Sequence, residues 1–194
     1  MTNMRAFIAV GLSKDVRFKI EEVINYFKTK TPLYTLNWVS PEHLHLTIKF
    51  IGEIEEDKIE ALQGVMLQSL EHQPSFEIEI CGLGMYPNKN RPRVIWLGIN
   101  GGEPLVTLHK IFDKKMVEFG IQRDDRPFSP HLTIARVRRN VDLSTVKSIG
   151  TTLSEYNVES LGIVNIGQVN LYKSVLMPSG PIYSTLFSVP LNQV

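Results

Sequence analysis

The chain has 194 residues, of which 43% are hydrophobic and 21% are charged, and its formal net charge is +1. These values are ordinary for a globular protein of one domain or two small lobes, and they point to no class of partner. No apolar run approaches the ~18 to 20 residues that a membrane-spanning helix needs, so we expect no membrane association. Cys81 stands alone, which excludes an internal disulfide and a cysteine metal cluster, and the cytoplasm is the expected compartment.

Hydrophobic periodicity in the first half of the chain predicts strands and helices in alternation. The expected strands are residues 4–12, 35–39, 44–51 and 75–81. The expected helices are one that follows Ser13 as its N-cap and ends before Pro32, and one over residues 57–70. Gly52 and Glu53 are expected to end the third strand. Residues 82–92, rich in glycine, proline and basic residues, are expected to form a loop.

The second half of the chain repeats this alternation. The expected strands are residues 93–99, 131–137, 163–172 and 183–189. The expected helices are residues 105–119 and 143–153. The apolar parity of residues 163–172 changes at Gly167–Gln168, which predicts a β-bulge there. Residues 178–181 are expected to form a turn.

The tetrapeptide His-Leu-Thr-Ile occurs twice, at residues 45–48 and 131–134. In a chain of this length, a second copy arises by chance on the order of once in a thousand sequences of average composition. Residues two apart on a strand share one face, so each copy can present an imidazole and a hydroxyl side by side while its Leu and Ile face a core. The repeat therefore indicates both a duplicated unit and a candidate site.

The expected elements around the two copies follow the same order: strand, helix, His-Leu-Thr-Ile strand, helix, strand. The first strand and the histidine are also similarly spaced, with 38 residues from Phe7 to His45 and 36 from Ile95 to His131. We therefore expect a single α+β domain of two pseudo-symmetric lobes, each a mainly antiparallel sheet with helices on its outer face, around a central cleft. The expected extents are 1–81 and 93–173 for the lobes, and 181–190 for a strand that completes the sheets.

Two histidines that face each other across a cleft can divide acid and base catalysis between them. An unperturbed imidazole has a pKa near ~6.5, so one can accept a proton while the other donates one. Phosphoryl transfer needs such groups in line with the attacking and leaving oxygens, and hydrogen-bond donors on the remaining phosphate oxygens. His45 and His131 are therefore candidate catalytic residues. Thr47 and Thr133 are candidate phosphate-binding residues.

The segments around both copies resemble a known family. Glu42–Glu53 (EHLHLTIKFIGE) and Arg126–Arg136 (RPFSPHLTIAR) are similar to the two signatures of the 2H phosphoesterases. They are nearest to those of the RNA 2′,3′-cyclic phosphodiesterases, also called 2′-5′ RNA ligases. Arg5–Val10 and the segment from Ser174 to Tyr183 fit the same subfamily. The resemblance covers almost the whole chain, and the four His and Thr residues do not depart from the motifs.

The resemblance implies hydrolysis of a 2′,3′-cyclic phosphate at an RNA end to a 2′-phosphate, without a metal ion or other cofactor. It implies His45 as the proton donor to the 3′ oxygen and His131 as the base on water, roles that the residues by themselves leave open. It also implies the reverse chemistry, 2′-5′ ligation on a 5′-hydroxyl. The expected partners are RNA with a cyclic phosphate end, such as tRNA fragments, or small cyclic nucleotides. The protein is expected to be a monomer.

Further candidates flank the two copies. Arg126 and Arg136 are candidate substrate contacts, although strict alternation places Arg136 on the face opposite His131, five residues earlier. Phe50 could stack on a base, as Trp38 and Tyr86 could, but core packing is the first expectation for all three. Two basic groups are either solvated surface or an anion site. They are Lys89, Arg91 and Arg93, and Arg123, Arg126, Arg136, Arg138 and Arg139.

Two alternatives compete with this hypothesis. The first is a metal hydrolase, in which His43, His45 and His131 form a three-histidine site. The lack of carboxylates clustered with these residues argues against it. The second is a module that binds RNA or nucleotides without turnover. Outside these alternatives, His43 is expected at the rim of the site, and His72 and His109 on helix surfaces.

Overall fold

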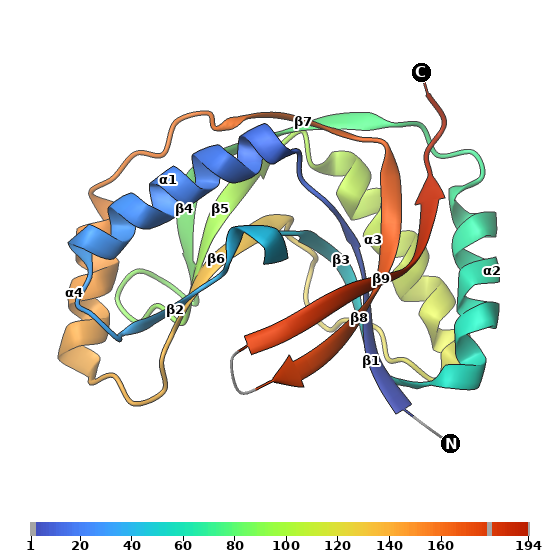
Figure 1. The fold of residues 1–194 in the computed structure, drawn as a ribbon, viewed down its shortest axis with the longest axis horizontal. Coiled ribbons are helices and arrows are strands. Elements are labelled where there is room, and N and C mark those ends of the chain that lie inside the picture. The colour runs from blue at the N-terminus through green and yellow to red at the C-terminus, as the bar shows by residue number, and fades with distance from the viewer. Residues whose placement is uncertain (1–2, 178–179, 194) are drawn as a thin grey trace.

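The structure is a computed structural model that describes residues 3–177 and 180–193. Figure 1 shows the strands and helices of the chain. The strands are β1 (Asn3–Val10), β2 (Leu36–Trp38), β3 (Leu46–Glu55), β4 (Phe76–Tyr86), β5 (Val94–Asn100), β6 (His131–Val137), β7 (Gly162–Ile166), β8 (Gln168–Met177) and β9 (Gly180–Pro190). The α-helices are α1 (Lys14–Lys30), α2 (Ile59–Leu70), α3 (Glu103–Lys115) and α4 (Leu143–Ser154). Short 3₁₀ helices are η1 (Pro41–His43), η2 (Glu56–Lys58) and η3 (Met116–Phe119).

Two antiparallel sheets form the body of the molecule (Figure 1). One has the strand order β3-β1-β8-β9 and the other the order β2-β6-β5-β4-β7. Helices α2 and α3 lie against the first sheet, and α1 and α4 lie against the second. A cavity between the sheets is lined by residues of both. This arrangement confirms the expected α+β fold of two pseudo-symmetric halves around a central cleft.

The two halves of the chain exchange elements between the sheets. Strand β4, from the first half, pairs with β5 and β7 in the second sheet, and β8, from the second half, pairs with β1 in the first sheet. The helices cross in the same manner, because α1 lies against the second sheet and α3 packs on β3. Each sheet is therefore built from both halves, and neither coincides with the contiguous segment 1–81 or 93–173.

Several elements differ from the prediction at glycines. Strand β3 continues through Gly52 to Glu55, and β4 continues through Gly82 to Tyr86. Both glycines have positive φ (79° and 70°) at register shifts, where a left-handed residue fits a bulge without ending the strand. The bulge predicted within residues 163–172 is wrong, because Gly167 separates β7 and β8, which belong to different sheets. The turn expected at 178–181 lies partly outside the described residues.

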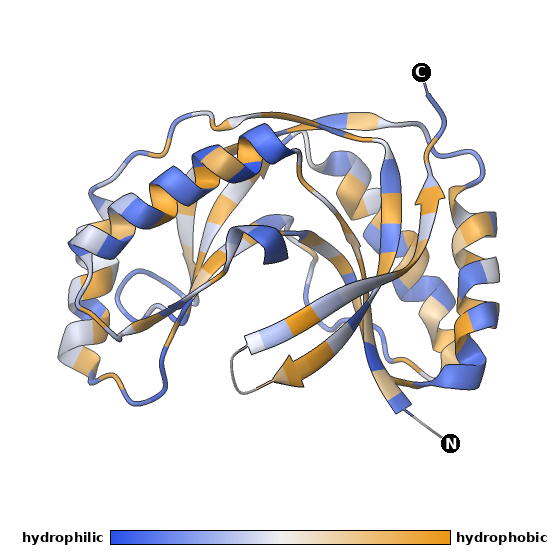
Figure 2. Ribbon diagram, viewed as in Figure 1, coloured by the Kyte–Doolittle hydropathy of each residue, from blue (hydrophilic) through white to orange (hydrophobic). Residues whose placement is uncertain are grey.

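The helices form where apolar residues recur at helical spacing, and Figure 2 shows the hydrophobic and hydrophilic stripes that result. At the start of α1, the side chain of Ser13 accepts a hydrogen bond from the Val16 amide at 3.4 Å, as expected of an N-cap. Buried side chains from both sheets and from all these α-helices form one continuous core. Each large aliphatic side chain buried there contributes roughly 1.5–3 kcal/mol. No helix among residues 3–177 and 180–193 is both long and apolar enough to cross a membrane.

Two helix glycines give a matched test of this packing. Gly150 lies within α4 and Gly64 within α2. A Cβ at Gly150 would overlap the carbonyl oxygen of Lys89, whereas one at Gly64 would meet no atom within 4 Å. We expect Gly150→Ala to destabilise the protein by about 1–3 kcal/mol, because the backbone of the β4–β5 loop must move. Gly64→Ala should instead stabilise it by roughly 0.5–1 kcal/mol through helix propensity. Urea unfolding measures both, and equal shifts would contradict the close approach of α4 to the loop.

Candidate active site

Both His-Thr pairs line a cavity of about 500 Å³ between the sheets. His131 and Thr133 are on β6, Thr47 is on β3, and His45 immediately precedes β3. The Leu and Ile residues of both copies are buried, as alternation predicts. The four side chains singled out by the repeat are therefore brought together from opposite sheets, although the two copies are 86 positions apart in the sequence.

A β-bulge in each strand decides which further side chains reach the cavity. The pairing register skips Ile48 in β3 and Ile134 in β6. One extra residue shifts the alternation, so the fifth residue after each histidine returns to the histidine's face. These residues are Phe50 and Arg136, and both line the cavity. The prediction that Arg136 faces away from His131 is therefore wrong, as is core packing of Phe50, which is 61% exposed.

Both imidazoles are oriented by a backbone carbonyl two residues earlier. His45 Nδ1 lies 2.7 Å from the carbonyl oxygen of His43, and His131 Nδ1 lies 2.8 Å from that of Ser129. A carbonyl oxygen can only accept a hydrogen bond, so Nδ1 must carry the proton in each ring. Nε2 is then the atom that each histidine can offer to a substrate, as an acceptor when the ring is neutral and as a donor when it is charged.

Aromatic rings surround both histidines. Phe7 stacks on His45 with the ring centroids 4.7 Å apart, and Tyr183 meets His45 edge-on at 5.1 Å. Burial lowers the pKa of His45 below its ordinary value because it disfavours the charged ring, and the hydrogen bond to the His43 carbonyl only partly opposes this shift. The neutral imidazole of His45 is therefore favoured in the free protein. His131 lies against Tyr86 and Trp96, at 5.1 and 5.9 Å.

Two arginines give the cavity positive charge. Arg5 lines it from β1 and Arg136 from β6. Neither belongs to an ion pair formed within residues 3–177 and 180–193. Burial raises the pKa of Tyr183, and the charges of the two arginines oppose that rise, so its hydroxyl stays protonated at neutral pH. The cavity thus combines two cations and neutral donors with one carboxylate, Asp124, which is paired with Lys49, and this combination favours an anionic ligand.

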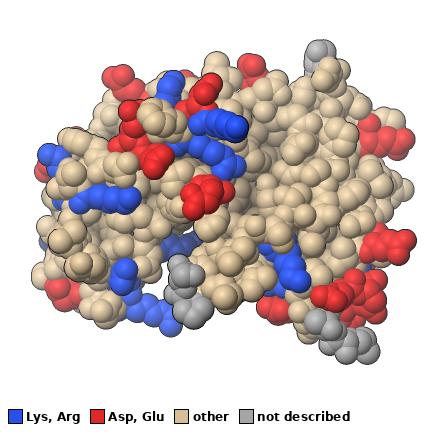
Figure 3. Space-filling view, in the orientation of Figure 1, with Lys and Arg blue, Asp and Glu red and all other residues tan. Residues whose placement is uncertain are grey.

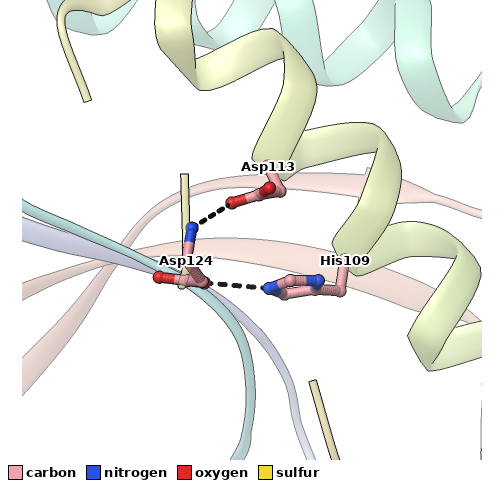
Figure 4. Close-up of side chains that lie close together, drawn as sticks. All are labelled: His109, Asp113 and Asp124. Atoms are coloured by element: carbon pink, nitrogen blue, oxygen red, sulfur yellow. Dashed lines mark hydrogen bonds and ion pairs between the residues drawn. The ribbon is translucent and has the colours of Figure 1, made fainter. Parts of the chain in front are cut away.

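Lys49 lies behind the site in an ionic network that was not predicted from the sequence. Its side chain is 1% exposed, and its Nζ lies 2.7 Å from Asp113 Oδ1 and 3.0 Å from Asp124 Oδ2. Asp113 also accepts a hydrogen bond from the backbone amide of Asp124, and Asp124 is paired with His109 Nε2, each at 2.9 Å (Figure 4). The network joins β3, α3 and the segment before β6. Two residues of that segment, Asp124 and Phe128, line the cavity.

This network contains a group of potential metal ligands, because donor atoms of His109, Asp113 and Asp124 all lie within 4.8 Å of one another. The Lys49 ammonium contacts both carboxylates and neutralises the charge that would attract a cation. His109 is 6% exposed and stacks on Phe128 at 4.4 Å, so its expected surface position is wrong. Within the described residues, His43, His45 and His131 do not form such a ligand group, which argues against the three-histidine metal site.

The other predicted residues fall into two groups. His43 lines the cavity and meets Tyr183 edge-on at 5.2 Å, in agreement with a rim position. Arg126 is exposed and is not among the described residues that line the cavity, so its contact with substrate stays a prediction. No site role was predicted for Arg5 or Tyr183. Both residues lie in segments that carry part of the family resemblance, and this resemblance was the signal in the sequence that could have identified them.

Comparisons with known proteins agree with this geometry. The chain matches the family model described as LigT like Phosphoesterase twice, over residues 10–96 and 97–183. The chain belongs to this family. The two matches correspond to the two halves that each contribute one His-Thr pair, and they confirm the resemblance to the 2H phosphoesterases.

Relatives match the LigT-like phosphoesterase chain over nearly its whole length. The RNA 2′,3′-cyclic phosphodiesterase of Methanothermobacter thermautotrophicus is 33% identical over 94% of this chain and 96% of that protein. The protein of the same name from Thermotoga maritima is 30% identical over 95% and 94%. Among solved structures, TT0787 of Thermus thermophilus has a TM-score of 0.78 at 25% identity, covering 97% of this chain and 98% of that one. Escherichia coli LigT complexed with 3′-AMP shares the fold, with a TM-score of 0.76 at 24% identity over 99% and 100%.

Lys49→Met tests whether the ionic network supports the fold. We expect a loss of about 2–4 kcal/mol in the free energy of unfolding at pH 7, because Asp113 and Asp124 lose their buried cationic partner. Urea unfolding measures the loss. Lys58→Met is the matched control: it removes an exposed ion pair with Glu55, 2.8 Å long, and should change the stability little.

The pH dependence of that loss has a definite sign. Burial would raise the pKa of Asp113, but hydrogen bonds from Lys49 and from the Asp124 amide outweigh it and hold that pKa below its usual value. A depressed pKa adds stability above the unfolded value of about 3.9, and this contribution disappears as the pH falls through the folded value. Without Lys49, burial dominates and the carboxyl protonates more readily. The difference between Lys49→Met and wild type should therefore shrink as the pH falls from 7 through the depressed pKa of Asp113, below about pH 4, and a constant difference over that range would contradict the network.

Proposed function

We propose that this protein hydrolyses the 2′,3′-cyclic phosphate at an RNA end to a 2′-phosphate, and that a 5′-hydroxyl in place of water opens the same cyclic phosphate to give 2′-5′ ligation. The observation that carries this proposal is the pair of His-Thr units facing one cavity, each imidazole with Nδ1 bound to a carbonyl and Nε2 available. The relatives named RNA 2′,3′-cyclic phosphodiesterase support the reaction and the substrate class, since one is 33% identical over 94% of this chain. They favour an enzyme over a module that only binds RNA.

In the proposed mechanism, the cyclic phosphate lies between the two imidazoles. His131 Nε2 accepts a proton from water while the water oxygen attacks phosphorus. The bond from phosphorus to the 3′ oxygen breaks, and His45 Nε2 donates a proton to that oxygen, which leaves a 3′-hydroxyl and a 2′-phosphate. Thr47 and Thr133 donate hydrogen bonds to the non-bridging oxygens, and Arg136 offsets the charge that develops there. Positioned acid–base catalysis of this kind contributes on the order of 10²–10⁴-fold in rate.

The acid role of His45 requires its charged form, which burial disfavours in the free protein by lowering the pKa of the imidazole. A bound phosphodiester carries one negative charge, and an opposite charge within a few ångströms raises the pKa of an imidazole. The substrate would thus help to protonate the residue that acts on it. Free protein and complex should therefore differ in the protonation state of His45.

The rim of the cavity supports an RNA end as the substrate. Phe50 exposes an aromatic face there, which can stack on the terminal base without selecting its identity. Arg126 is a further candidate contact on the segment that leads into β6. RNA ends such as those of tRNA fragments, and small cyclic nucleotides, are the proposed substrates. A monomer in the cytoplasm is the proposed form of the enzyme.

Substitution of either histidine tests the mechanism. His45→Ala and His131→Ala should each lower kcat on a 2′,3′-cyclic nucleotide by about 10²–10⁴-fold. Thr47→Val and Thr133→Val should cause smaller losses, because hydrogen bonds are lost but proton transfer is kept. Chromatography of the product should show a 2′-phosphate, and exhaustive chelation should leave the rate unchanged. Unaltered turnover in both histidine variants would refute the two-histidine mechanism, and a 3′-phosphate product would reverse the leaving group.

Titration of His45 tests its protonation state. By NMR, the pKa of its imidazole should lie below the ordinary value of about 6.5 in the free protein. Saturation with a nucleoside 2′-phosphate should move the midpoint upward, because the bound anion stabilises the charged ring. The Thr47→Val variant provides a control with the same rings around His45 and weaker phosphate binding. A midpoint that does not respond to the ligand would contradict His45 as a group in contact with the phosphate.

A further inference from the structure

Two basic residues after His131, Arg136 in β6 and Arg138 just beyond its end, form a row that continues out of the cavity. Arg136 lines the cavity. The chain beyond it stays extended and paired, because Val137 pairs with Leu36 and the Arg138 amide donates to the Thr35 carbonyl at 2.9 Å. Arg138 is the first residue after β6, and its backbone continues the extended course of the strand. This places it on the same face as Arg136, about 6.6 Å beyond it.

The basic row has no acidic partner among the described residues. Arg136 and Arg138 are exposed, and neither belongs to an ion pair of the described chain. The nearest carboxylate after them in sequence, Asp142, instead accepts hydrogen bonds from Ser144 and Thr145 at the start of α4. Figure 3 shows Lys and Arg side chains gathered at the lower left, beside the recess between the two lobes.

A third arginine lies beside this row. The carbonyl oxygen of Arg93 accepts a hydrogen bond from the Val137 amide at 3.0 Å, so its backbone is one strand spacing away. Guanidinium groups that form no ion pair within residues 3–177 and 180–193 are available to an anion that arrives from solvent. Since the row begins at the cavity, that anion can be covalently joined to the group bound inside it.

We propose that Arg138 binds the phosphate on the 5′ side of the terminal nucleoside, so that the enzyme prefers an RNA chain to a cyclic mononucleotide. This inference rests on the proposed function, because the cyclic phosphate held between the His-Thr pairs is the starting point of the row. Adjacent phosphates of an extended RNA strand are spaced much as alternate residues of a β-strand are, so β6 can follow the RNA backbone. A guanidinium binds a phosphate through two parallel N–H donors. Such contacts position the RNA without reading its sequence.

The test compares a 2′,3′-cyclic mononucleotide with a dinucleotide that ends in the same cyclic nucleotide. The two substrates differ by one nucleoside and its linking phosphate. Arg138→Ala should raise KM for the dinucleotide roughly tenfold, leave kcat unchanged, and leave both constants for the mononucleotide unchanged. A neutral methylphosphonate linkage should cause the same loss in the wild-type enzyme and abolish the effect of the substitution. On longer RNA, the slope of log kcat/KM against log salt should become shallower by about 0.7, the value for one phosphate contact on a single strand.

Arg139→Ala is the matched control, since Arg139 is the next residue, is also exposed, and lies in the turn after the strand. It should leave KM for the dinucleotide within about twofold of the wild-type value. Equal losses in the two variants would indicate a general positive field and overturn the site at Arg138, as would an unchanged KM in Arg138→Ala. Turnover of neither substrate by the wild-type enzyme would overturn the proposed function and the inference together. Wild-type turnover of both substrates with no effect of Arg138→Ala would overturn the inference alone.

Discussion

The site depends on one extra residue in each of two equivalent strands. Without the bulge at Ile134, Arg136 would turn toward the helices and Ala135 toward the cavity. Without the bulge at Ile48, Lys49 would place its ammonium on the face of Thr47, and Phe50 would point toward α3. A bulge leaves one residue unpaired in the ladder, but the two isoleucines are 1% and 0% exposed, so their burial offsets that loss. The isoleucine at the end of each His-Leu-Thr-Ile copy is therefore also the bulged residue that decides which later side chains line the cavity.

The two halves differ at the residue that follows each bulge. The residue after the bulged isoleucine is Ala135 in β6 and Lys49 in β3, and both are fully buried. The side chain of Ala135 has no polar group that needs a partner there. Lysine at the equivalent position needs partners, and it finds them in Asp113 and Asp124 at 2.7 and 3.0 Å. Lysine in place of alanine at this position thus attaches the segment before β6 to the sheet that contains β3. This segment includes Phe128, which lines the cavity.

Local pattern predicted most elements and the four central residues of the candidate site, because each depends on spacing within a few residues. Ser13, the apolar periodicity of the helices and the His-Leu-Thr-Ile repeat are signals of this kind. The exchange of β4 and β8 between sheets could not be predicted in this way, since strand pairing is decided by contacts distant in sequence. Strict alternation also failed at both bulges, so it misplaced Arg136 and missed Lys49. Arg5 and Tyr183 were missed because only the assembled sheet brings β1 and β9 to the cavity.

The two histidines are oriented alike because they occupy equivalent positions in the two halves of the chain. Their neighbours differ between the halves, and these differences allow the two histidines to act differently. The hydrogen bonds to His43 and Ser129, at 2.7 and 2.8 Å, are nearly equal in length and direct both Nε2 atoms outward, so orientation alone assigns neither acid nor base. The distinction must come from the surroundings. Phe7 and Tyr183 desolvate His45, whereas Arg136 extends the side of His131 into a row of cations. In the proposed complex, an RNA end that lies along this row would meet the two imidazoles in a defined order. In the proposed mechanism, the division of labour between two identical motifs therefore follows from their different surroundings, which are aromatic rings around His45 and a row of cations beyond His131.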